Sequence, residues 1–120
     1  MTERIHRPWG WYESLLIEAG YQVKRLCVEP KQALSLQSHE HRDEYWTVVQ
    51  GKGLVTLGIE RYLLENTEIS EGSTVFIPKK RIHRATNTGS SPLVIIEVQR
   101  GGYLGEDDIK RYEDRYGRAS

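Results

Sequence analysis

The stretch QSHEHRDEYWTVVQG, residues 37–51, crowds nitrogen and oxygen ligands into eight residues directly before an apolar strand pattern. Alternation along an extended chain puts Gln37, His39 and His41 on one face. Glu44 lies five residues after His39, so a turn or bulge is needed to bring its carboxylate to the same side. Imidazole, carboxylate and amide oxygen form a plausible mixed metal site. A solvated hairpin tip that is rich in histidine is the alternative.

A second segment lies about forty residues downstream and supplies His83, framed by Pro78 and Asn87. We expect the two segments to meet around a metal ion, held together by a β-barrel formed from the rest of the chain.

Length and composition narrow the class of protein. The 120 residues suit one domain, residues 1–120, with a real core. Seventeen basic residues balance seventeen acidic ones, which argues against a nucleic-acid partner. The single cysteine, Cys27, excludes a disulfide framework and a cysteine-based zinc cage, and fits a reducing cytoplasm. Apolar runs are too short to span a bilayer, and the first residues lack the pattern of a signal peptide. We therefore expect a cytoplasmic protein without a membrane partner.

Short apolar segments between glycine and proline turns predict an all-β sandwich or small barrel. The glycines of Gly51-Lys52-Gly53 predict a hairpin turn. In the segment 21–29, Lys24 shares a face with Leu26 and Val28. The strands are expected at residues 9–18, 21–29, 33–37, 44–50, 54–59, 74–77, 81–86 and 93–99, with 60–67 left open.

The two ends have a different character. Residues 1–8 are polar and predict a loose N-terminal arm. Residues 105–116 predict a short C-terminal helix, because acidic residues precede basic ones and suit the helix dipole. Ile109, Tyr112 and Tyr116 would lie on one face of that helix.

The second segment resembles a motif of the cupin superfamily, in which two motifs supply metal ligands from facing strands of a β-barrel. Gly72, Pro78, His83 and Asn87 match that motif in spacing, while Lys80 stands where glycine is usual. The resemblance implies a double-stranded β-helix, the jelly-roll barrel of cupins, with His83 as a ligand.

The first cupin motif fits the sequence in two registers. His39 and His41 as the first pair leave only two residues before Glu44. Gln37 and His39 as the pair leave the usual four, and then six before Gly51, with Lys31 where the motif usually begins with glycine. This register implies Gln37, His39, Glu44 and His83 as ligands, with His41 lining the pocket. The other register stays open because histidine is the commoner ligand.

A narrower resemblance covers nearly the whole chain. The segments RPWG (7–10), LSLQ (34–37), IEVQ (96–99) and YLGEDDI (103–109) are similar to the C-terminal domain of type II mannose-6-phosphate isomerases. Those enzymes often carry a mannose-1-phosphate guanylyltransferase domain as well. The family usually has histidine at the positions of Glu40 and Tyr45. The chain shows no glycine-rich phosphate loop, so we expect it to act as a standalone domain without guanylyl transfer.

The resemblance implies a metal-dependent isomerase that interconverts mannose 6-phosphate and fructose 6-phosphate in nucleotide-sugar and polysaccharide precursor metabolism. One divalent ion is expected: zinc first, with manganese, cobalt, nickel or iron also acceptable to such ligands. A non-catalytic cupin that binds a sugar phosphate or sugar nucleotide beside a separate guanylyltransferase is the alternative. A cupin dioxygenase is a third option, since the fold hosts many chemistries.

The reaction predicts further site residues. Glu97 is the candidate base, because burial in an apolar strand raises a carboxyl pKa, and a structural ion pair is its alternative role. Lys24 is a second catalytic candidate, unless its side chain follows the apolar surface outward. Arg7, Arg42 and Arg100 are candidate phosphate ligands. Open sheet edges and the aromatic N-terminal stretch predict a homodimer.

Overall fold

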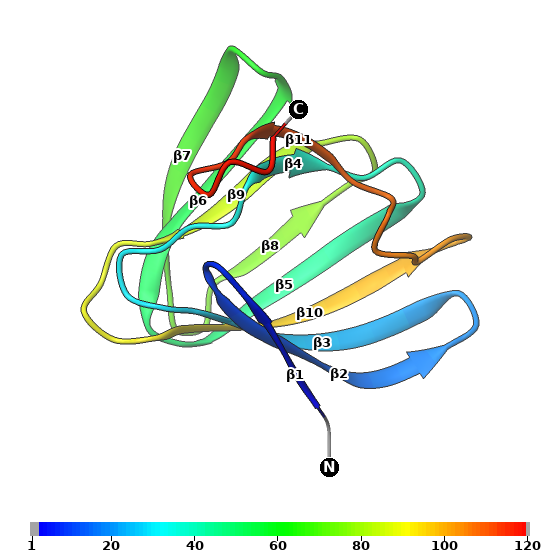
Figure 1. Ribbon diagram of the computed structural model, residues 1–120, viewed down its shortest axis with the longest axis horizontal. Coiled ribbons are helices and arrows are strands. Elements are labelled where there is room, and N and C mark those ends of the chain that lie inside the picture. Colours follow the sequence, from blue (N-terminus) through cyan, green and yellow to red (C-terminus); the bar gives the residue numbers. More distant parts are fainter. Residues whose placement is uncertain (1–2, 120) are drawn as a thin grey trace.

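The computed structural model describes residues 3–119, and within them two antiparallel sheets face each other (Figure 1). Six strands form one sheet in the order β1-β2-β3-β10-β5-β8, and five form the other in the order β11-β4-β9-β6-β7. The strands are β1 (Arg4–Arg7), β2 (Gly10–Glu18), β3 (Tyr21–Val28), β4 (Leu36–Ser38), β5 (Arg42–Gln50), β6 (Lys52–Glu60), β7 (Leu63–Ser70), β8 (Thr74–Ile77), β9 (Ile82–Asn87), β10 (Leu93–Gly101) and β11 (Lys110–Glu113). The all-β prediction is confirmed.

The turn at Gly51 does not close a hairpin, contrary to the sequence prediction. Strands β5 and β6 belong to different sheets, so this turn is a corner between the two layers. Gly51 has a φ of 84°, and a Cβ atom there would lie 2.4 Å from the carbonyl oxygen of Pro92. Only glycine accepts both conditions, so the corner depends on it.

Side chains from the inner faces of both sheets form the core. Strand alternation directs Leu26 and Val28 inward from β3, and Val55 and Ala85 inward from the opposite sheet. The complete buried cluster is Trp9, Leu26, Val28, Leu34, Trp46, Val48, Val55, Ile69, Ile77, Ala85, Leu93 and Ile95. This cluster fills one end of the space between the sheets and leaves the other end for polar side chains.

The predicted C-terminal helix over residues 105–116 is wrong. Residues 105–108 form a turn in which the Asp108 amide donates to the Gly105 carbonyl, and β11 then pairs with β4. The helical pattern was short, and cross-strand hydrogen bonds to the otherwise open edge of β4 outweigh so weak a local preference. No helix long and apolar enough to cross a membrane occurs between residues 3 and 119.

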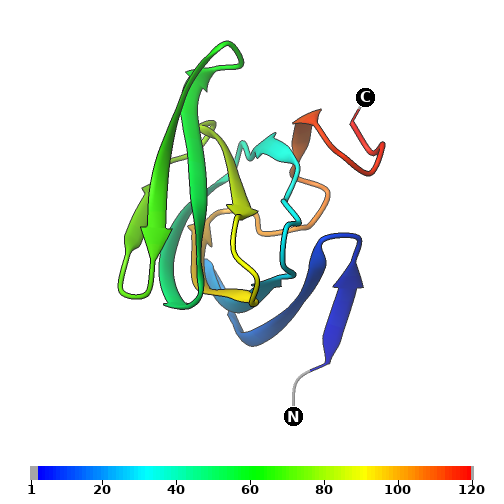
Figure 2. The same ribbon diagram turned by 90° about the vertical axis from the view of Figure 1, so that its left-hand side faces the viewer.

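The loose arm predicted for residues 1–8 is also a strand in part. Residues Arg4–Arg7 pair with Gly10–Glu13 of β2, while the first two residues of the predicted arm lie outside the described range. Strands β1 and β11 therefore end the two sheets, and both lie on the same side of the molecule (Figure 2).

Candidate metal centre

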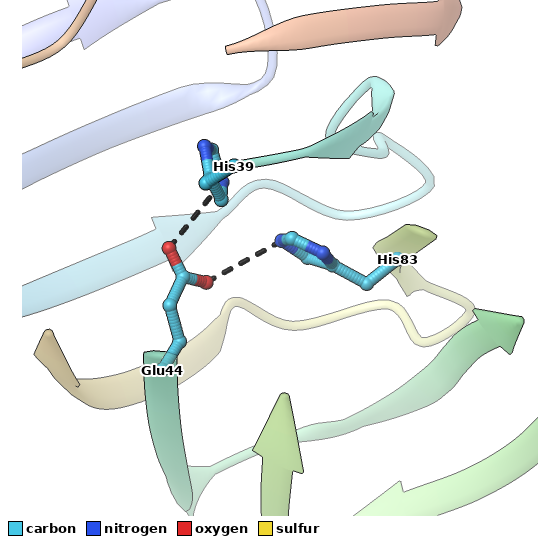
Figure 3. A group of neighbouring side chains, drawn as sticks. All are labelled: His39, Glu44 and His83. Carbon is cyan, nitrogen blue, oxygen red and sulfur yellow. Dashed lines mark ion pairs between the residues drawn. The ribbon is translucent and has the colours of Figure 1, made fainter. Parts of the chain in front are cut away.

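Three buried side chains from both sheets converge at the polar end of the barrel (Figure 3). Glu44 comes from β5, His83 from β9, and His39 from the bend after β4. One potential ligand atom from each lies within 4.8 Å of the other two. The Nε2 atom of His39 is 3.3 Å from Glu44 Oε2, and Nε2 of His83 is 3.4 Å from Glu44 Oε1.

Backbone carbonyls fix which nitrogen each imidazole presents to Glu44. The Nδ1 atom of His39 lies 2.7 Å from the Asp108 carbonyl oxygen, and Nδ1 of His83 lies 2.9 Å from that of Arg81. A carbonyl oxygen only accepts, so each Nδ1 carries a proton and donates. Burial lowers the pKa of His39 to about 4, which keeps this ring neutral at pH 7 and leaves its Nε2 lone pair toward the carboxylate. The arrangement suits a cation bound between the rings.

Arg42 contacts the same ligand atoms. Its Nε donates to Glu44 Oε2 at 2.8 Å and its Nη2 to His39 Nε2 at 3.2 Å. Burial by itself would raise the pKa of Glu44, but interactions with His83, His39 and Arg42 hold it well below its usual range. Arg42 therefore lies inside the ligand cluster, deeper than its predicted place beside a phosphate. Its buried Nη1 has no hydrogen-bond partner among residues 3–119.

A cavity opens beside this cluster and has a volume of about 580 Å³ with its open mouth included. Residues from both sheets and from the segment after β10 line it. Of the residues predicted from sequence, the cavity wall contains Arg7, Lys24, Gln37, Arg42, Glu44, His83 and Glu97. The structure thus gathers most of the predicted site residues around one open cavity.

Glu97 is as buried as the core, with 4% of its surface exposed. Trp46 Nε1 donates to its Oε2 at 2.8 Å, and Gln99 Nε2 donates to its Oε1 at 2.6 Å. Burial raises the pKa of Glu97 to about 7, and the negative charge of Glu44 adds to the shift. A carboxyl group that titrates near neutral pH at a cavity wall has the properties of a general base.

Lys24 points into the cavity, as its alternation with Leu26 and Val28 predicted. Its Nζ lies 2.6 Å from Glu106 Oε2 and 4.5 Å from the centre of the Tyr12 ring. Sequence reasoning missed Glu106, because the acidic run 106–108 resembled the first turn of a helix.

Asp108 from the same run fastens the His39 bend and was missed for the same reason. Its two carboxylate oxygens accept from the backbone amides of Glu40 and His41, each at 2.9 Å. Its carbonyl accepts from His39 Nδ1, so one residue holds three consecutive positions of the ligand segment. Such outer contacts orient metal ligands in proteins.

The geometry favours the register that begins at Gln37. Gln37 is the cross-strand partner of His83 and lines the cavity, where its Nε2 donates to the carbonyl and hydroxyl of Ser35. His41 is exposed, and its ring lies 6.1 Å from that of Tyr103, outside both the ligand group and the cavity wall. Coordination by Gln37 itself stays a prediction.

Three other positions lie away from the cavity. Arg100 is exposed and follows Gln99, whose side chain points inward, so the structure does not bring this predicted phosphate ligand to the site. Glu40 is exposed, and Tyr45 faces outward and stacks on Phe76 at 4.9 Å. Both departures from the family pattern therefore leave the ligand cluster untouched.

Comparison with known proteins places these features in context. Residues 1–114 match the family model described as mannose-6-phosphate isomerase C-terminal. The alginate biosynthesis protein AlgA of Pseudomonas syringae is 48% identical over 97% of this chain. The mannose-1-phosphate guanylyltransferase ManC of Salmonella typhimurium is 46% identical over 98% of it. The chain spans about a quarter of the length of these relatives, 23% and 24%.

A solved structure supports the fold independently. A Klebsiella pneumoniae protein described by its double-stranded β-helix domain aligns with a TM-score of 0.72 over 93% of this chain and 86% of that one. At 21% sequence identity this likeness concerns the fold alone. It agrees with the predicted double-stranded β-helix.

Proposed function

The chain belongs to the family of mannose-6-phosphate isomerase C-terminal domains, and on this premise we propose that it interconverts mannose 6-phosphate and fructose 6-phosphate. The proposed role is the supply of sugar precursors for polysaccharides. One observation carries the proposal: Glu97, a carboxyl group with a pKa near 7, shares a cavity with a buried group of metal-ligating side chains.

The donor set fits a divalent cation. His39, Glu44 and His83 would hold it, with Gln37 as the proposed fourth ligand and zinc as the first candidate. When bound, the ion polarises sugar oxygens and stabilises the negative charge that develops on them. Arg42 occupies part of the same space through its contacts with Glu44 and His39, so loading requires its guanidinium to withdraw.

The aldose–ketose interconversion moves one proton between adjacent carbons, and we assign this transfer to Glu97. Its carboxylate form takes the proton from C2 of mannose 6-phosphate and returns it to C1, while a second proton shifts in the same direction, from O2 to O1. A base with a pKa near the working pH is present in both protonation states, as the two half-steps require. Hydrogen bonds from Trp46 and Gln99 fix the direction of the carboxyl group.

Lys24 completes the proposed catalytic set. Its ammonium group lies on the strand next to Glu97, since the two residues are cross-strand partners. There it can donate to sugar oxygens while Glu106 holds it in place at 2.6 Å. Lys24 therefore orients the substrate in this scheme, and Glu97 moves the proton.

The contacts of Arg42 favour a second candidate function. A guanidinium that satisfies Glu44 and His39 would let the site bind ligands without a metal. The chain would then be a non-catalytic module that binds a sugar phosphate or sugar nucleotide and serves a separate guanylyltransferase.

The homodimer also stays a prediction, and sedimentation velocity on the purified chain would test it.

The first experiment is a coupled assay, in which the formation of fructose 6-phosphate is followed through the absorbance change of a dye or cofactor. The chain would be stripped with a chelator and reloaded with zinc, manganese, cobalt, nickel or iron in turn. We expect turnover that disappears in His39→Ala and His83→Ala and persists in His41→Ala, because only the last side chain lies outside the group of candidate metal ligands. Absence of turnover in a folded, metal-loaded chain would overturn the isomerase proposal, and ligand binding without product would favour the binding module.

A further inference from the structure

A row of cross-strand partners leads from the candidate metal ligand His83 to the edge of the five-stranded sheet. His83 on β9 is the partner of Gln37 on β4, and Gln37 is the partner of Arg111 on β11. Partners in adjacent strands point to the same face. Arg111 accordingly lines the same cavity as Gln37 and His83, at the end of the row that lies on the edge strand β11.

Most cations in the cavity wall already have a carboxylate partner. Lys24 pairs with Glu106, Arg42 with Glu44, and Arg118 makes two side-chain bonds to Asp114. Arg7 donates to the backbone carbonyl of His6 and lies 5.4 Å from the Tyr12 ring. Arg111 differs from all of these.

The side chain of Arg111 makes no hydrogen bond or ion pair with any residue from 3 to 119, and its Nε is buried without a partner. A buried guanidinium N–H without an acceptor is unfavourable, so its position beside an open cavity indicates a ligand that accepts hydrogen bonds there. Guanidinium groups match phosphate oxygens in geometry and charge.

We propose that Arg111 binds the phosphate of the substrate, with Arg7 closing on it from the edge of the opposite sheet. This assignment rests on the proposed function and names the part of the site that holds the anionic end of the sugar. It replaces Arg100, which the sequence suggested and which lies exposed on the outer face of β10.

The spacing suits a six-carbon sugar phosphate. Arg111 lies two strands from His83, and adjacent strands are about 4.8 Å apart, so their backbones are separated by roughly 10 Å. A sugar whose first two carbons lie near the metal ligands and Glu97 therefore extends its C6 phosphate along the row toward Arg111. Arg7 and Arg111 belong to β1 and β11, which lie on the same side of the molecule (Figure 2).

The test measures binding rather than turnover. Isothermal titration calorimetry would follow mannose 6-phosphate and orthophosphate binding to the wild-type chain, Arg111→Gln and Arg111→Lys. Arg100→Gln is the matched control, because it removes the same charge from the outer face. We expect Arg111→Gln to raise both dissociation constants about 10- to 100-fold, the loss of charge-assisted hydrogen bonds, and Arg100→Gln to change them less than twofold.

Each outcome decides the proposal. Equal affinities in wild type and Arg111→Gln, or no binding of either probe to the wild-type chain, would overturn it. If thermal unfolding shows that Arg111→Gln does not fold, Arg111→Lys decides: it keeps the charge without the planar fork, and we expect at least a threefold loss for orthophosphate, whereas an unchanged affinity would refute the assignment. Phosphate binding through Arg111 in a chain that fails to isomerise would support the subsite and refute the isomerase. Turnover with an unchanged KM in Arg111→Gln would support the isomerase and refute the phosphate subsite at Arg111.

Discussion

The inward face of strand β10 contributes to two different regions, the apolar core at its start and the polar cavity at its end. Leu93 and Ile95 at its start are 0% exposed and belong to the apolar core. Glu97 and Gln99, farther along the same face, are 4% and 1% exposed and face the ligand cavity. The apolar half and the polar half of the barrel are therefore equally buried, and burial alone does not reveal which half has a chemical role.

The two halves are stabilised in different ways. The apolar half gains from removing hydrocarbon surface from water, which needs no particular partner. The polar half needs each group to find its donor or acceptor, as Glu97 does with Trp46 and Gln99. Mutations in the apolar half should thus reduce stability and leave chemistry intact, while mutations in the polar half should affect chemistry, metal dependence and pH dependence.

The largest contrast is expected between neighbours on β10. Glu97→Gln removes the proposed base while keeping its shape, and should reduce kcat about 100- to 10,000-fold. Ile95→Val removes one methylene from the core and should lower the free energy of unfolding by about 0.5–1.5 kcal/mol, with kcat unchanged. The coupled isomerase assay and urea unfolding would measure the two effects. A Glu97→Gln enzyme with wild-type kcat would refute the role given to this residue.

A second contrast concerns metal-dependent stability. Arg42→Met leaves the Glu44 carboxylate buried without its guanidinium partner, and should lower the free energy of unfolding of the chelated chain by about 3–5 kcal/mol. Zinc should restore much of this loss, because it binds the folded chain and replaces the missing positive charge.

Arg84→Met is the matched control for that experiment. Arg84 pairs with Glu113 at 3.3 Å near the surface, where an ion pair contributes about 0–1 kcal/mol. Urea titrations with and without zinc would compare the two variants. Equal losses in both would show that Arg42 does not hold the ligand cluster together.

The smallest contrast is a pH effect in the chelated chain. The folded-state pKa of Glu97 is about 7, so between its ordinary pKa of 4.5 and pH 7 the folded chain keeps a proton that the unfolded chain releases, and stability falls as pH rises. His39 acts in the opposite direction: its folded-state pKa is about 4 against 6.5, so stability rises between these values. The two effects largely cancel in the wild-type chain.

Glu97→Gln should expose the effect of His39. Relative to wild type, its free energy of unfolding should rise by roughly 3 kcal/mol between pH 4.5 and 7, the equivalent of the removed pKa shift. Urea unfolding at intervals of half a pH unit would measure the difference, with Glu65→Gln on the exposed face of β7 as control. Parallel curves for wild type and Glu97→Gln would contradict the raised pKa.

The predictions from sequence succeeded where the signal was local. His39, Glu44 and His83 are side chains of the right chemical type at motif spacing, and strand alternation then directs Glu44 and His83 inward. The same alternation placed Lys24 correctly on the inner face. Most strand positions were recovered for the same reason, since period-two patterns depend on near neighbours in the sequence, but β1, β7 and β11 were not assigned as strands.

The predictions failed where pairing between distant segments decides the outcome. Residues 110–113 form a strand because β4 offers an open edge. The sequence of residues 105–116 contains no information about that edge. Arg42 and Arg100 were both predicted as phosphate ligands, yet alternation and the bend at 39–41 direct Arg42 to Glu44 in the candidate ligand cluster and Arg100 to the surface. Arg111 was concealed by the helix prediction that covered it.

The contacts of Asp108 with residues 39–41 also set an order of events during protein synthesis. The ribosome releases His39, Glu44 and His83 well before residue 108, so the ligands exist for some time without the clasp that orients the first of them. His39 is therefore oriented toward Glu44 and His83 only after residues 105–113 have folded against β4.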